Sequence, residues 1–64
     1  MVFRERTFSV LLVSASQKFI DAMAALLPPA DFWPVTTARS AGEARRLLAE
    51  EETDLVLINT PLPD

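Results

Sequence analysis

The side chains able to take part in chemistry are few, and most of them come directly after two apolar segments. Ser14 and Ser16 follow the first segment, and Asn59 and Thr60 follow the second. Hydroxyl and amide groups form hydrogen bonds, but they lack the anionic oxygens that a hard cation such as Mg²⁺ usually requires. The chain has no cysteine and no histidine, which excludes thiolate zinc sites, cysteine nucleophiles and histidine acid–base catalysis. We therefore expect a protein that is not an enzyme and that holds no metal or cofactor.

The composition is that of a folded protein with an apolar core. Half of the 64 residues are apolar and 23% are charged, which excludes an intrinsically disordered segment. The net charge is −3, whereas a nucleic-acid-binding surface usually needs a basic excess, so we expect no direct contact of this segment with nucleic acid. The apolar runs are shorter than the roughly 20 residues that span a bilayer, and the N-terminal pattern does not match a signal peptide. We expect a cytoplasmic protein without membrane association.

Three segments are predicted to be strands. Phe8–Val13 and Asp54–Asn59 are nearly continuous apolar runs, which is typical of strands buried on both faces of a parallel sheet. The segment Phe32–Ala38 is also rich in strand-forming residues, but it contains Pro34. Because proline cannot donate a hydrogen bond to a sheet ladder, we expect this strand at a sheet edge.

Two stretches between these segments have helical periodicity. The first extends from Gln17 to Leu27 and ends before Pro28, because proline disfavours helical geometry in the preceding residue. Its apolar stripe comprises Phe19, Ile20, Met23, Leu26 and Leu27. The second begins with Ser40 and Glu43 in the S-x-x-E pattern of a capping box, whose two side chains accept from main-chain N–H groups at the helix start. Its apolar face comprises Ala44, Leu47 and Leu48.

The order strand, helix, strand, helix, strand predicts parallel pairing with right-handed crossovers. A sheet order of 2-1-3 puts the proline-containing strand at an edge and the first strand in the centre, with the helices on opposite faces. This arrangement is the opening of a flavodoxin-like, doubly wound α/β sheet. Ligands of such sheets bind beyond the carboxyl ends of the strands, where the strand order reverses. We expect Asn59 to lie at that point, beside Ser14.

The chain resembles the receiver domain of response regulators. The most specific likeness is Asp54-Leu55-Val56-Leu57-Ile58-Asn59-Thr60-Pro61-Leu62-Pro63-Asp64, where receivers have Asp-Leu-Val-Leu-Leu-Asp-x-x-Met-Pro followed by Gly or Asp. The segments Val10–Val13 and Ser40–Ala44 add to it. The resemblance implies that residues 1–64 form the first part of a receiver domain, with the family's fourth and fifth strands beyond Asp64.

The resemblance places the family's phosphoacceptor position on Asn59 and the positions of its metal-binding acidic pair on Ser14 and Ala15. The loop after the phosphoacceptor position is Thr60, Pro61, Leu62 and Pro63. An amide is no nucleophile for phosphoryl transfer, and neither Ser14 nor Ala15 offers Mg²⁺ a carboxylate. The resemblance therefore implies a pseudo-receiver, similar to the degenerate receivers of ANTAR-type antiterminator regulators. Such a module is non-catalytic and regulates transcription through dimerisation or partner contact.

The sequence leaves alternatives open at the level of function. A conventional phosphorelay receiver could use another carboxylate, for which Asp64 is a candidate. A small nucleotide-binding α/β unit is a second alternative, although the turn Ser14–Ser16 lacks the G-x-G-x-x-G pattern that phosphate binding favours. Asn59 could also be an ordinary polar residue at a strand end. Ser14 and Ser16 could cap a helix, and that helix start could hold an anion.

Two further side-chain types have ordinary structural interpretations. Trp33 is expected to pack in the core or in an interface, and a partner-binding hot spot is the alternative. The arginines are expected on a solvated helix face, paired with neighbouring acids, and not in an RNA or phosphate patch. The residues concerned are Arg39, Arg45 and Arg46 with Glu43, Glu50 and Glu51.

The third strand is expected to leave an unprotected sheet edge. Leu55–Ile58 contains no charge, proline or bulge signal that would blunt such an edge. A chain of this length buries only about 60% of its unfolded surface and is marginally stable alone. We therefore expect self-association through this strand, as a homodimer in which the two copies pair antiparallel about a two-fold axis.

Overall fold

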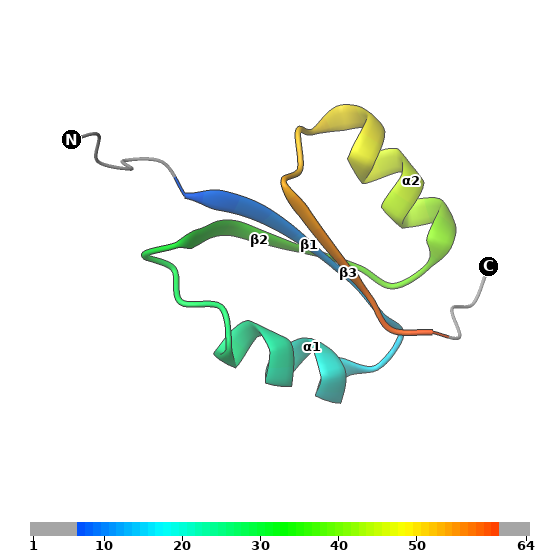
Figure 1. Cartoon of the computed structure of the whole chain (residues 1–64). Helices are drawn as coiled ribbons and strands as arrows, with labels where there is room; N and C mark the ends of the chain where they lie inside the picture. Colours follow the sequence, from blue (N-terminus) through cyan, green and yellow to red (C-terminus); the bar gives the residue numbers. More distant parts are fainter. Residues whose placement is uncertain (1–6, 61–64) are drawn as a thin grey trace.

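The computed structural model describes residues 7–60, which form a three-stranded parallel sheet between two helices (Figure 1). The elements in chain order are β1 (Phe8–Val13), α1 (Gln17–Ala25), β2 (Phe32–Ala38), α2 (Ala41–Glu50) and β3 (Leu55–Ile58). The strands lie in the order β2-β1-β3. The α/β class, the parallel pairing and the flavodoxin-like strand order predicted from the sequence are confirmed.

The central strand β1 supplies the core on both faces of the sheet. Leu11 and Val13 pack with residues of β2, α2 and β3 on one face. Val10 and Leu12 pack on the other face, against α1. This alternation follows from strand geometry, because successive side chains point to opposite faces. Figure 1 shows α1 and α2 on opposite sides of the sheet, so both faces of β1 are covered, as its continuous apolar run predicts.

Helix α1 ends two residues earlier than its apolar pattern predicts. Its last turn tightens, with the N–H of Leu26 donating to Met23 O (3.0 Å) and that of Leu27 to Ala24 O (3.2 Å). Pro28 lacks an N–H and restricts the residue before it, so the helix cannot continue. Leu26 was expected on the buried stripe, but it is 69% exposed because it lies at the helix end, beyond the part that faces the sheet.

Strand β2 lies at the sheet edge, as Pro34 predicts, and it carries an irregularity at that residue. Phe8 is paired with Phe32 and Val10 with Val35, so β2 contains one residue more than β1 over this stretch. The extra residue lets Phe32 and Val35 both face α1. Trp33 therefore points away from the core and is 61% exposed. Of the two positions expected for this residue, the core or an interface, the core is wrong, whereas packing in an interface stays a prediction.

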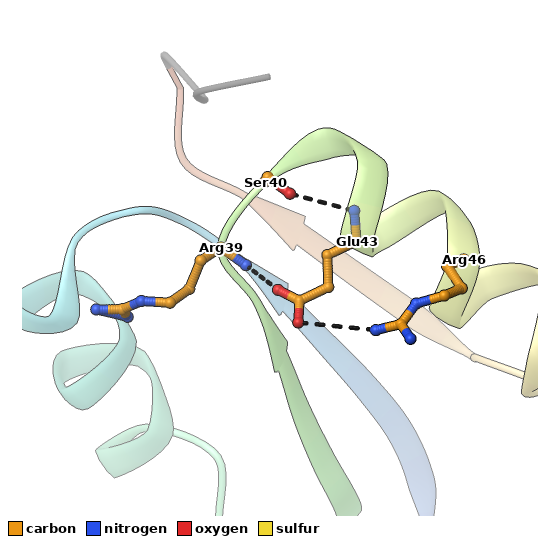
Figure 2. Close-up of polar contacts among 4 residues, drawn as sticks. All are labelled: Arg39, Ser40, Glu43 and Arg46. Atoms are coloured by element: carbon orange, nitrogen blue, oxygen red, sulfur yellow. Dashed lines mark hydrogen bonds and ion pairs between the residues drawn. The ribbon is translucent and has the colours of Figure 1, made fainter.

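Helix α2 begins with the predicted capping box, in a form shifted by one residue (Figure 2). The N–H of Glu43 donates to Ser40 Oγ (3.2 Å), as expected. Glu43 Oε1 accepts from the N–H of Arg39 (2.7 Å), the residue before the N-cap. Ala44 is buried and Leu47 packs against the core, whereas Leu48 is exposed although it was expected on the same face. Only the side of α2 that carries Ala44 and Leu47 packs against the sheet, so the buried face of the helix is narrower than predicted.

Hydrogen bonds between Ser9 and Asp54 fix the start of β3 beside the start of β1. The N–H of Ser9 donates to Asp54 Oδ2 (2.8 Å), and the N–H of Asp54 approaches Ser9 Oγ at 3.0 Å. The Ser9 hydroxyl lies 3.2 Å from the same carboxylate oxygen and 3.0 Å from Glu52 O. The strand was predicted to begin at Asp54, but β3 begins at Leu55. Asp54 lies just before the strand and forms these hydrogen bonds with Ser9.

Neither helix in the described part of the chain is long and apolar enough to cross a membrane.

Replacing Ser40 by alanine is expected to lower the free energy of unfolding by about 1 kcal/mol, because the N–H of Glu43 loses its acceptor. This corresponds to a fall in Tm of roughly 4–8 °C, measurable by circular dichroism. Ser40→Asp is the control, since aspartate is also a good N-cap residue. An equal loss of stability in both variants would show that the cap does not stabilise α2.

Candidate functional site

The carboxyl ends of β1 and β3 bring Ser14 and Asn59 together. Val13 is paired with Ile58 in the sheet, so the residues that follow them leave the strands side by side. The N–H of Asn59 donates to Val13 O (2.9 Å), which continues the ladder one residue beyond the strand. Asn59 Nδ2 donates to Ser14 Oγ at 3.1 Å. The predicted proximity of these two side chains is confirmed.

The Ser14 hydroxyl is fully buried and its hydrogen-bonding capacity is used. Ser14 has 0% exposure. Its Oγ accepts from the N–H of Ser16 (2.9 Å) and from Asn59 Nδ2, and the hydroxyl donates to Ser16 O at 3.5 Å. A hydroxyl oxygen has two lone pairs, and both are occupied here. Ser14 Oγ therefore has no lone pair left for a metal ion in this arrangement.

Ser14 also joins all three strands at this edge of the sheet. It follows β1, its N–H donates to Ala38 O at the end of β2 (2.9 Å), and its hydroxyl receives the Asn59 amide after β3. A buried hydroxyl without partners would be costly, so these bonds explain how a polar side chain is accommodated among apolar ones.

The turn after β1 starts α1 through Ser16. Ser16 is the N-cap, and its Oγ accepts from the N–H of Phe19 (3.2 Å). Of the two serines considered as caps, Ser16 has this role, whereas Ser14 accepts from the N–H two residues ahead. Ala15 lies between them, is exposed and presents only a methyl group.

Asn59 and Thr60 form the outer part of the site. Asn59 is partly buried and Thr60 is exposed. An asparagine amide is neutral, so it can hydrogen bond but carries no anionic oxygen. Pro61, Leu62 and Pro63, the rest of the predicted loop, lie outside the described residues, as does Asp64.

A second polar chain crosses the carboxyl edge between α1 and the loop after β2. Arg39 Nη1 donates to Gln17 Oε1 (3.1 Å), and Gln17 Nε2 donates to Asp21 Oδ1 (2.8 Å). Figure 2 shows the Arg39 side chain extending away from Glu43. The sequence predicted acidic partners for Arg39 and did not identify Gln17, which lies 22 residues away in the chain. This partner could be recognised only once the topology placed the start of α1 beside the loop after β2.

One of the ion pairs predicted on α2 is formed by Arg46 and Glu43, whose Nη2 and Oε2 atoms lie 3.9 Å apart. The side chain of Arg46 is 63% exposed and that of Glu43 is 40% exposed, and surface pairs of this kind contribute about 0–1 kcal/mol. Within residues 7–60, no group of three or more acidic side chains is placed to hold a metal ion.

Comparisons of the chain with known protein families, curated proteins and solved structures found no match. The site is therefore defined by its own geometry, which is a buried serine hydroxyl and an asparagine amide at the carboxyl edge of a β2-β1-β3 sheet.

Coupling between Ser14 and Asn59 is expected in a double-mutant cycle. Ser14→Ala leaves the N–H of Ser16 and the Asn59 amide without their acceptor, so we expect a loss of about 1–3 kcal/mol in the free energy of unfolding. Because the two side chains share one hydrogen bond, the losses in Ser14→Ala and Asn59→Ala should not add, with a coupling of at least about 0.5 kcal/mol. Urea titration of the four proteins measures it. Additive losses would mean that the bond does not stabilise the fold.

Proposed function

We propose that this chain is a receiver-like signalling module that cannot be phosphorylated at its phosphoacceptor position and that acts through contact with another protein. The observation that carries the proposal is the hydrogen bond from Asn59 Nδ2 to Ser14 Oγ at the carboxyl edge of the sheet. It joins the two positions that the resemblance to receivers assigns to the phosphoacceptor and to the first residue of the acidic pair.

The chemistry of the site supports a non-catalytic role. Phosphoryl transfer to a receiver requires a carboxylate nucleophile and further carboxylate oxygens that hold Mg²⁺, because this ion binds hard anionic oxygens. Here the nucleophile position is a neutral amide, the Ser14 hydroxyl is saturated with hydrogen bonds, and Ala15 has no polar side chain. The amide takes part in a direct side-chain hydrogen bond instead, and this bond needs no metal.

We also propose how a signal reaches this module and in what kind of protein the module lies. The hydrogen-bonded pair of Asn59 and Ser14 provides no carboxylate that could accept a phosphoryl group. A signal would therefore have to act by changing the contacts of this module with another protein. The likeness to the degenerate receivers of ANTAR-type regulators suggests a cytoplasmic protein that regulates transcription by antitermination. In such a protein this segment would supply protein contacts and another segment would bind RNA.

Treatment with acetyl phosphate and Mg²⁺ is expected to leave the intact mass of the chain unchanged, because Asn59 is not a nucleophile. Mass spectrometry of the untreated and treated protein checks this. A stable gain of one phosphoryl group would contradict the proposal and favour a phosphorelay receiver that uses a different carboxylate.

Restoring the three acidic side chains is expected to create a Mg²⁺ site. The variant Ser14→Asp with Ala15→Asp and Asn59→Asp should be stabilised by about 1.4 kcal/mol at a Mg²⁺ concentration ten times its Kd, and thermal unfolding with and without Mg²⁺ measures this shift. Because Ser14 is buried, Ala15→Asp with Asn59→Asp serves as a milder companion. The unmodified chain is the control. If neither variant responds to Mg²⁺, these positions do not correspond to the receiver site.

A further inference from the structure

Arg39 contacts both helices, with different parts of the same residue. Its main-chain N–H donates to Glu43 Oε1 (2.7 Å), which belongs to the capping box of α2. Its side chain donates from Nη1 to Oε1 of Gln17 (3.1 Å), the first residue of α1. Figure 2 shows these two groups of Arg39 on opposite sides of the residue, with the N–H facing Glu43 and the guanidinium group extending away from it.

These two contacts form the centre of a continuous polar chain. In α1, Gln17 Nε2 donates to Asp21 Oδ1 (2.8 Å), about one turn further along the helix. In α2, Glu43 Oε2 lies 3.9 Å from Arg46 Nη2, again about one turn further. The Gln17 amide can serve both of its neighbours because it has an oxygen that accepts and a nitrogen that donates. The chain therefore extends from α1 to α2 through Arg39.

The apolar cores of the described residues do not provide such a link between the helices. The helices lie on opposite faces of the sheet (Figure 1), and each packs against its own set of β1 side chains. Within residues 7–60, the two core clusters share no side chain. Arg39 bypasses the sheet, because the loop that contains it passes round the carboxyl end of β2.

The two contacts of Arg39 depend on each other because its main chain is held on both sides. Ala38, the residue before it, is buried and accepts from the N–H of Ser14 (2.9 Å). Ser40, the residue after it, is the N-cap of α2. Since the end of β2 is fixed, a change in the capping box turns the main chain of Arg39 and moves its guanidinium group relative to Gln17.

We propose that Arg39 couples the start of α1 to the start of α2, so that fraying of either helix start weakens the other. Each helix start is a two-state element, either capped or frayed, and a shared contact biases both equilibria. The inference rests on the proposed function, for which it names the route by which a protein contact on one face of the sheet affects the other face. Both contacts of Arg39 are exposed, so we expect a small coupling, about twofold in the equilibrium constant for fraying.

Hydrogen exchange at two amides measures this coupling, because each amide closes the first turn of one helix. The N–H of Ile20 donates to Ser16 O in α1 (3.1 Å), and the N–H of Ala44 donates to Ser40 O in α2 (3.0 Å). The two amides belong to helices on opposite faces of the sheet. A change in α2 that alters the exchange of Ile20 has therefore crossed from one face to the other.

Glu43→Ala is expected to speed exchange at Ile20 about twofold, and Gln17→Ala should speed exchange at Ala44 by a similar factor. The control is the same pair of substitutions in Arg39→Ala, which keeps the main-chain N–H but removes the side-chain bond to Gln17. Neither distant effect should remain in that background. Amides of the central strand β1 are the reference, because global destabilisation would speed their exchange by the same factor.

No change at the distant amide in one or both variants overturns the inference. So does a distant effect that persists in Arg39→Ala, or one that the β1 amides share, since either result assigns it to the sheet or to global stability. These outcomes are independent of the acetyl phosphate result. Absence of coupling removes only the route between the two faces, whereas a gain of one phosphoryl group removes only the non-catalytic function.

Discussion

The structure depends on the complete enclosure of β1. This strand is hydrogen bonded to β2 along one edge and to β3 along the other, and its alternate side chains form the centres of two separate cores. Because Leu11 and Val13 serve one core while Val10 and Leu12 serve the other, each helix is positioned by residues of the same strand. Burial of a leucine or valine side chain contributes about 1.5–3 kcal/mol, so these four residues are a large part of the stability of so small a protein.

The candidate site results from the same strand. β1 and β3 end in register, and the first polar residue after each therefore emerges at one point. Ser14 is buried because it is still partly within the sheet, and it needs partners from neighbouring strands, which Ala38 and Asn59 supply. A substitution at Asn59 therefore acts on the structure of this edge of the sheet. The Asn59 amide stabilises the junction of β1 and β3 through its hydrogen bond to Ser14.

Much of the fold could be predicted from the sequence because the informative residues act locally. The continuous apolar runs indicate the strands, Pro34 indicates the edge position of β2, and the S-x-x-E pattern indicates the start of α2. None of these inferences requires knowledge of distant residues. The exposure of Trp33 could not be predicted, because it depends on an extra residue in β2 that becomes visible only against the pairing with β1. The contacts of Gln17 with Arg39 and of Ser9 with Asp54 were missed for a related reason, since each joins segments that only the completed topology brings together.

The two ends of β3 are held by side chains in the same way. Ser9 contacts Asp54 at one end and Ser14 contacts Asn59 at the other, and each pair is separated by 45 residues in the chain. Closing a loop of that length costs on the order of 3 kcal/mol in free energy through lost chain entropy. The first of the two pairs to form incurs this cost, and the second pair then forms with almost no further loss of entropy. The strand should therefore attach and detach as one unit, with no stable state in which only half of it is docked.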